Sequence, residues 1–224
     1  MKPRNTHLIA ALAAGDASMR LKAVLAIGSN PDPGLLDTLI ARCAIEPDFY
    51  VRDMLTWALT RLPSEITLPG LLAELRSERA QARSQALHTL SKIKDPGAWP
   101  AITRSLLCDP DDEVARSAWR AAVVLVPNGQ EKDLAGELAG QFGRGDREMQ
   151  LSLSRALVAL KEKAARGEEE GEEVVGPALR KAMACGDPGV RAHASAVERL
   201  LRNPDTGSAN AVNEAKRIFA LGKE

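Results

Sequence analysis

The chain has 224 residues and equal numbers of acidic and basic side chains, 30 of each, so its net charge is zero. This balance argues against a general polyanion-binding protein, though it allows a local basic patch. Hydrophobic residues make up 45% of the chain, which excludes a disordered sequence. Aromatic residues are only 3%, and the apolar content is mainly Ala, Leu, Val and Ile, which favours closely packed helices over sheets.

One short phrase recurs along the chain, with an Asp at a turn, an Arg four residues later and then an apolar run. Its copies begin at Asp16, Asp48, Arg79, Asp112, Asp146 and Asp187, and their anchor positions are Arg20, Arg52, Arg83, Arg116, Gln150 and Arg191. The anchors are separated by 32, 31, 33, 34 and 41 residues. A period in this range predicts a solenoid of stacked supersecondary units.

Each copy predicts the start of a helix, because an Asp side chain can accept hydrogen bonds from the first free backbone N–H groups. After Asp48, apolar residues follow at helical spacing, from Val51 through Leu55 to Leu62. A second, preceding helix is predicted in every unit, at 6–14, 33–44, 68–77, 98–108, 132–142 and 176–185. A polar linker and a capping helix are predicted over 203–224. The fold class is therefore all-α, with six helix pairs and a C-terminal helix.

The repeat resembles the HEAT-repeat family, in particular its short bacterial form named after phycobilisome lyases. The segments that carry the resemblance most strongly are "DDEVARSAW" and "DPGVRAHAS", and the likeness covers residues 6 to 202. It implies a right-handed α-α superhelix, a single domain over 1–224 and an Asp–Arg ladder that links neighbouring repeats. Arg79 and Gln150 depart from the family pattern, so no complete ladder is predicted at those two joints. The residues predicted to form this structural ladder are Asp16, Arg20, Asp48, Arg52, Arg83, Asp112, Arg116, Asp187 and Arg191.

The longest anchor separation coincides with an acidic stretch, "RGEEEGEEVVG", at residues 166–176. Like charges this close together repel, so an exposed loop insertion or a frayed helix end is predicted there. The acidic residues within this stretch, 168–173, allow two interpretations. They are either a solvated insertion or a docking strip for a basic partner.

A candidate binding surface follows from the helical positions of the second helices. Trp57 lies about 200° around its helix from the core residue Leu55, so it is not expected in the core of its own repeat. An aromatic side chain flanked by Arg and small polar residues is typical of an interface hot spot. Burial of Trp57 by the curvature of the superhelix or by the terminal helix is the alternative. The residues predicted to line the concave face are Asp53, Trp57, Thr60, His88, Arg120 and Arg155.

No catalytic, metal or nucleotide motif accompanies this surface. The three histidines and three cysteines form no metal-ligand spacing, and neither GxGxxG nor GxxxxGK[ST] occurs. No cofactor is predicted. Dispersed cysteines and the absence of a signal-peptide pattern or a long apolar segment predict a cytoplasmic protein that does not enter a membrane.

The leading functional hypothesis is a non-enzymatic protein–protein interaction scaffold or regulatory binding module. The sequence also resembles actinobacterial HEAT-repeat proteins that accompany, or are fused to, MerR-type DNA-binding headpieces, which makes a transcription regulator a candidate partner. An enzymatic alternative is the HEAT-like alkylpurine DNA glycosylase class, with roles for Trp57 and Asp53, although the zero net charge weighs against nucleic acid. A bilin lyase or lyase subunit is a further alternative, suggested by the family name.

Overall fold

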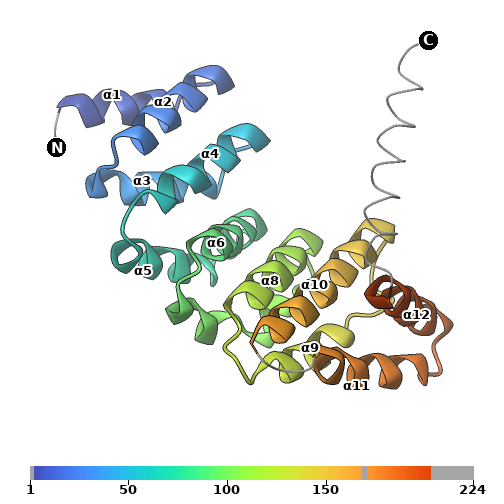
Figure 1. Cartoon of the computed structure of the whole chain (residues 1–224). Coiled ribbons are helices and arrows are strands. Elements are labelled where there is room, and N and C mark those ends of the chain that lie inside the picture. The colour runs from blue at the N-terminus through green and yellow to red at the C-terminus, as the bar shows by residue number, and fades with distance from the viewer. Residues whose placement is uncertain (1–2, 168–170, 203–224) are drawn as a thin grey trace, which may run out of the picture. The chain divides into compact units, whose positions relative to one another are not determined.

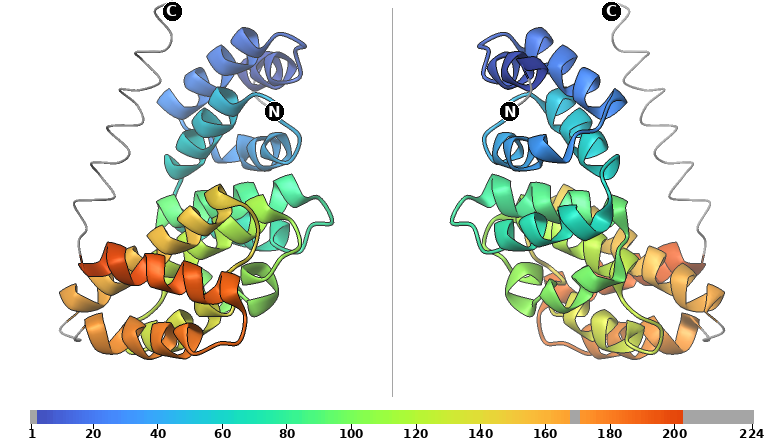
Figure 2. Two further views of the ribbon diagram at one scale, coloured as in Figure 1. Left: turned by 90° about the vertical axis from the view of Figure 1, so that its right-hand side faces the viewer. Right: turned by 90° about the vertical axis from the view of Figure 1, so that its left-hand side faces the viewer.

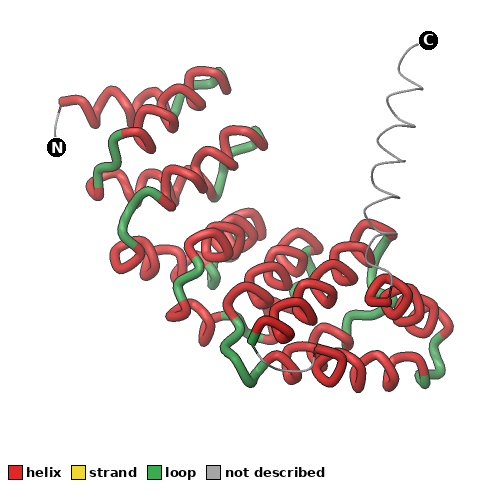
Figure 3. The backbone as a smooth tube through the Cα atoms, in the orientation of Figure 1, coloured by secondary structure: helices red, strands yellow, loops and turns green. Residues whose placement is uncertain are grey.

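Every regular element in residues 3–167 and 171–202, the part of the chain that this computed structural model describes, is a helix (Figure 3). The chain divides into two compact units, Met1–Pro127 and Asn128–Glu224, where the sequence predicted a single domain. The first unit holds four helix pairs and the second holds two within the described residues (Figure 1). The predicted all-α class and the predicted six pairs are thus confirmed. The predicted linker and capping helix at 203–224 lie outside the described residues.

In the first unit, each pair consists of a first helix, in two cases with a 3-10 turn before it, and a longer second helix. The bounds are α1 Pro3–Leu12, α2 Ala17–Ser29, η1 Pro33–Leu35, α3 Leu36–Cys43, α4 Phe49–Thr60, α5 Ser64–Glu74, α6 Ala80–Ile93, η2 Pro96–Ala101, α7 Arg104–Leu107 and α8 Asp112–Leu125.

The second helices of these four pairs form one continuous layer. Helix α2 packs on α4, α4 on α6 and α6 on α8, while α3 packs on α5 and α5 on η2. The side views in Figure 2 show the blue, cyan and green helices of this unit following one another in chain order. This is the solenoid-like stacking that the repeat predicted; the handedness of the superhelix stays a prediction.

The core of the first unit comes from the apolar stripe of each second helix. Leu55 and Leu59 of α4 and Leu87 and Leu90 of α6 are all fully buried. Trp119 of α8 is also fully buried, and its indole N–H donates to the Leu107 carbonyl at 2.8 Å. Because these residues recur at helical spacing, burying them requires that neighbouring pairs stack.

The second unit comprises α9 Glu131–Ala139, α10 Arg147–Arg166, α11 Gly171–Met183 and α12 Pro188–Arg202, with α11 in contact with the other three helices. The loop predicted at 166–176 is wrong in its second half. Helix α11 begins at Gly171, so residues 171–176 are helical, and Glu173 is exposed on that helix. Val174 and Val175 are buried, and burial of this apolar pair outweighs the repulsion on which the loop prediction was based. The remaining acids, 168–170, lie outside the described residues.

Candidate functional site

The second helices of the first unit begin at equivalent capping positions. The Asp16 carboxylate accepts from the Met19 N–H at 2.9 Å, and the Asp48 carboxylate accepts from the Val51 N–H at 3.0 Å. In α8 the cap is Asp111, which accepts from the Glu113 and Val114 N–H groups at 3.0 and 3.1 Å. The sequence placed this cap at Asp112, which is instead the exposed first residue of the helix. The register of the fourth copy is therefore shifted by one residue.

This shift removes Arg116 from the predicted ladder. In the other copies the ladder residue stands four positions after the cap, and in α8 that position is held by the fully buried Ala115. Arg116 is the fifth residue after Asp111, in line with Asp53 of α4 and Ser84 of α6. One residue turns a side chain by about 100° around a helix. Arg116 accordingly donates to Glu113 on its own helix, and no bond from it to the preceding turn occurs among the described residues.

The remaining ladder arginines donate hydrogen bonds to the turn that precedes their own helix. The Arg20 guanidinium donates to the Ala14 and Gly15 carbonyls at 3.0 and 2.7 Å. Arg52, Arg83 and, in the second unit, Arg191 repeat this pattern five and six residues upstream. Gln150 makes a single such bond, to the Gly145 carbonyl at 3.3 Å. Asp146 and Asp187 cap α10 and α12.

Two of these arginines also reach the next pair, and their acceptors are not the capping aspartates that the resemblance implied. Arg20 pairs with Glu46 at 2.7 Å, and Arg83 pairs with Asp109 at 3.0 Å. Each acid stands two residues before a cap, and its carboxylate also accepts the backbone N–H of that cap. The ladder therefore runs between arginine and a pre-cap acid, a position that the sequence analysis did not single out.

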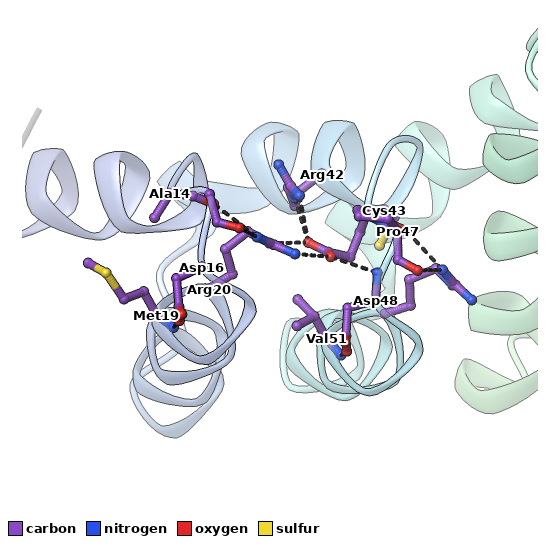
Figure 4. A network of polar contacts seen from close by, with 12 residues as sticks. Ala14, Asp16, Met19, Arg20, Arg42, Cys43, Pro47, Asp48 and Val51 are labelled. Atoms are coloured by element: carbon purple, nitrogen blue, oxygen red, sulfur yellow. Dashed lines mark hydrogen bonds and ion pairs between the residues drawn. The ribbon is translucent and has the colours of Figure 1, made fainter.

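Glu46 is the most enclosed of these acids, with no exposed side-chain surface. Figure 4 shows the Arg20 guanidinium between the Ala14 carbonyl and this carboxylate, with Arg42 approaching from the other side. Burial alone would raise the pKa of Glu46, but hydrogen bonds from Arg20, from the Asp48 backbone and from Arg42 outweigh it and lower the pKa to about 2. The carboxylate is therefore ionised throughout the physiological range.

The joint between the second and third pairs has no rung of this type. Ser77 occupies the pre-cap position there, and Arg79 takes the place of the capping Asp. The Gln81 amide instead donates back to the Cys43 and Glu46 carbonyls at 2.9 and 2.8 Å. Arg79, at which the sequence departs from the family pattern, therefore lies at a joint that is held by hydrogen bonds from an uncharged side chain.

A groove with a volume of about 540 Å³ crosses the exposed faces of α4, α6 and α8. Its floor on α6 includes the small residues Ala80 and Ser84, and its sides are formed by α4 and α8. The lining residues are Phe49, Arg52 and Asp53 from α4, Ala80, Gln81, Ser84, Gln85 and His88 from α6, and Asp111, Glu113, Arg116, Ser117 and Arg120 from the start of α8 and its cap.

Three of the six predicted surface residues meet in this groove: Asp53, His88 and Arg120. Trp57 does not line it, because its ring packs so closely on Gly28 of α2 that a Cβ atom there would overlap the ring. Thr60 is also absent from the lining, and its hydroxyl donates to the Trp57 carbonyl at 2.7 Å. Arg155 is exposed on α10 of the second unit. Arg116, which the sequence assigned to the ladder, is one of the groove residues that the predicted surface did not include.

Charged side chains of both signs line each side of the groove. Helix α8 and its cap contribute Arg116, Arg120, Asp111 and Glu113, and α4 contributes Arg52 and Asp53. Arg52 donates to turn carbonyls, and Asp111 accepts from the first N–H groups of α8. The Arg116 guanidinium donates to Glu113 at 3.0 Å, and Arg120 donates to the Ser117 hydroxyl at 3.1 Å. His88 stands between the two sides. Its pKa is lowered by burial and then by Arg120 and Lys92, while Asp53 acts in the opposite direction.

An exposed aromatic pair stands at the α4 end of the groove. The rings of Phe49 and Tyr50 meet edge to face at 5.7 Å, and the side chains are 65% and 72% exposed. The Arg52 guanidinium lies 6.0 Å from the centre of the Phe49 ring. The sequence analysis did not include either ring in the binding surface. The sequence did contain a sign that these rings are exposed, because both residues come before Val51, the first core position of α4.

The described residues contain no cluster of three or more His, Cys, Asp or Glu side chains that could hold a metal ion. Burial raises the pKa of the Cys43 thiol to about 12, which keeps it protonated and unsuited to nucleophilic chemistry. Within residues 3–167 and 171–202, no helix combines the length and apolar character needed to cross a bilayer.

No protein-family model and no curated protein matches the chain. Among solved structures, the chain is similar to the crystal structure of an engineered protein, with 16% identity, a TM-score of 0.45, and coverage of 91% of this chain and 98% of the other. A likeness at this level carries no conclusion about function.

Proposed function

We propose that the chain is a non-enzymatic protein-interaction module, and that its first unit binds an extended segment of a partner polypeptide in the groove across α4, α6 and α8. The single observation that carries the proposal is the groove itself. It combines polar and small residues on α6, side chains of both charges and an exposed aromatic pair at one end. Aromatic and arginine side chains are enriched at protein interfaces, and polar groups set the orientation of the bound segment.

The repeat pattern supports membership of the HEAT-repeat family, and we infer a cytoplasmic regulatory role from that likeness, with a transcription regulator as the candidate partner. Stacked helix pairs present extended surfaces to which each repeat contributes a few side chains. The zero net charge weighs against the DNA glycosylase alternative. Trp57, the aromatic residue assigned to that alternative, lies against α2 and does not line the groove.

A random dodecapeptide library displayed on phage tests the proposal. We expect peptides enriched on the wild-type chain to lose binding when Ser84→Trp fills the groove floor. The matched control is Ala73→Trp, which adds the same bulk at an exposed position of α5 outside the groove. If no peptides are enriched, or if the enriched peptides bind both tryptophan variants equally, the proposed function is wrong.

A further inference from the structure

Resting on the proposed function, we infer that the partner segment is charge-polarised, with an acidic side chain against Arg116 and Arg120 and a basic side chain against Asp53. The two arginines of α8 and the aspartate of α4 would then set the direction in which the segment lies across the groove.

The first step is the chemistry of Arg116. The ladder arginines donate their hydrogen bonds to turn carbonyls and buried acids. Arg116 does not do so, because it lies one residue further from the cap of its helix. Its guanidinium makes one bond, to the largely exposed Glu113, and its Nε is buried with no partner among the described residues. Leaving a buried donor unpaired is unfavourable, and a carboxylate can satisfy two guanidinium donors at once.

The second step is the position of Arg120. It follows Arg116 by four residues, so the two guanidinium groups share one face of α8 and repel each other. Both line the groove. Arg120 donates only to the neutral Ser117 hydroxyl among the contacts described for it. Glu113 already offsets this repulsion at Arg120. A further carboxylate placed between the two arginines would gain charge-assisted hydrogen bonds from donors that Glu113 and Ser117 do not use.

The third step is the opposite side of the groove. Asp53 is exposed on α4 and no acid–base pair involving it occurs among the described residues. Helix α6 lies between α4 and α8. Packed helices lie roughly 8–10 Å apart, so about 16–20 Å separates the two charged sides. An extended chain spans this distance in about five or six residues, which sets the spacing of the acidic and basic residues in the partner.

The fourth step is the charge of the whole chain. Its net charge is zero, so general attraction between the chain and an acidic segment is absent. Any preference for acid at the α8 side must therefore come from the local arrangement, and reversing the local charges must reverse the preference.

The test pans the same dodecapeptide library on three forms of the full chain. These are the wild type, the groove variant Arg116→Glu/Arg120→Glu, and the control Arg147→Glu/Arg199→Glu. The control makes the same change of net charge at exposed positions of the second unit. We expect wild-type and control panning to enrich Asp or Glu about five or six positions from Lys or Arg. The groove variant should lose the acidic preference and gain a basic one. Far-UV circular dichroism checks that each variant keeps its helices.

The enriched peptide, labelled with fluorescein, then supplies an affinity measurement by anisotropy. Replacing its acidic residue by Gln should weaken binding to the wild type at least about tenfold and leave binding to the double variant Arg116→Gln/Arg120→Gln changed by less than about twofold. Groove-dependent peptides without charge preference would overturn this inference while the proposed function survives. Equal binding of a fluorescein-labelled oligothymidine, displaced by the peptide, would overturn it in favour of a nucleic-acid ligand. Absence of any enriched peptide would overturn both.

Discussion

Arg20 and Glu46 form a buried ion pair, so replacing Glu46 should have the largest effect on the free energy of unfolding. Arg20 is 5% exposed and Glu46 is fully buried. Removing one member of a buried pair leaves the other charge uncompensated, so Glu46→Gln should lower the free energy of unfolding by about 3–5 kcal/mol. Urea denaturation followed by circular dichroism measures this. Glu113→Gln, which breaks the exposed pair with Arg116, is the control and should change stability by less than about 1 kcal/mol. A Glu46→Gln loss as small as the control would contradict the prediction.

A second stability prediction concerns Gly28, because the Trp57 ring occupies the space that a side chain at Gly28 would need. Gly28→Ala should destabilise the chain by about 1–3 kcal/mol through overpacking, despite the better helix propensity of Ala. Gly15→Ala is the control, since a Cβ atom there meets nothing within 4 Å. The two variants are compared by thermal unfolding. Equal or higher stability of Gly28→Ala would show that the ring moves freely, contrary to this packing.

The sequence predicted the capping residues where one Asp preceded the helix, as at Asp16 and Asp48. It misplaced the cap in α8 because Asp111 and Asp112 are adjacent and only the backbone selects between them. The pre-cap acids Glu46 and Asp109 were missed. Their spacing of two residues before a cap could have found their positions, whereas their burial depends on the neighbouring repeat and is not visible in a local pattern.

At the scale of a helix, the residue that precedes α6 has the backbone geometry of a capping residue but not a capping side chain. Arg79 adopts φ −80° and ψ 118°, close to the −81° and 128° of Asp48, but its side chain makes no capping bond. Arg79→Asp should therefore stabilise the chain by about 0.5–2 kcal/mol, by accepting a free N–H and by complementing the helix dipole. Arg79→Ala is the control and should leave the helix uncapped. Chemical denaturation compares the two, and equal stability of both variants would refute the capping argument.

The order and pairing of the helices could be predicted, because apolar spacing and turn residues repeat in every unit. Helix starts were less predictable. Helices were predicted to begin at residues 68 and 176, yet α5 begins at Ser64 and α11 at Gly171, so that Pro69 and Pro177 lie inside these helices. The upstream residues join these helices because their apolar side chains, such as Val174 and Val175, are buried by neighbouring helices. This information resides in tertiary packing, which a local pattern does not contain.

At the scale of the whole molecule, the α10–α12 contact around His193 and the α2–α4 contact around Glu46 should respond to acid at different pH. His88 of α6, whose pKa is also lowered by burial, adds a change of the same sign in the first unit but lies on neither of these helix pairs. In the second unit, His193 is buried, accepts the Gly143 N–H at its Nδ1 and donates from Nε2 to the Gln150 carbonyl. Burial lowers its pKa below the ordinary 6.5, although the bond to Gln150 acts in the opposite direction. A lowered pKa means that the unfolded state binds protons more readily, so this stabilisation is complete above about pH 6.5 and declines as the pH falls.

In the first unit, the lowered pKa of Glu46 has the same sign but acts at lower pH. Its stabilisation is complete above the ordinary 4.5 and is lost toward about 2. Hydrogen exchange measured from pH 7 to pH 4 should therefore show α10 and α12 losing protection before α2 and α4. His193→Gln should remove most of the early change. Simultaneous loss of protection in both helix pairs would contradict this order.

The single-residue offset of α8 has a consequence for how such a chain can change. The turn before α8, residues 108–111, is as long as the turn before α2, residues 13–16, so the offset lies in where the arginine follows the cap. An arginine four residues after the cap binds the preceding turn, whereas Arg116, five residues after it, pairs with Glu113 on its own helix. Exchanging two adjacent residues of one repeat can therefore change its binding face while the neighbouring repeats keep theirs.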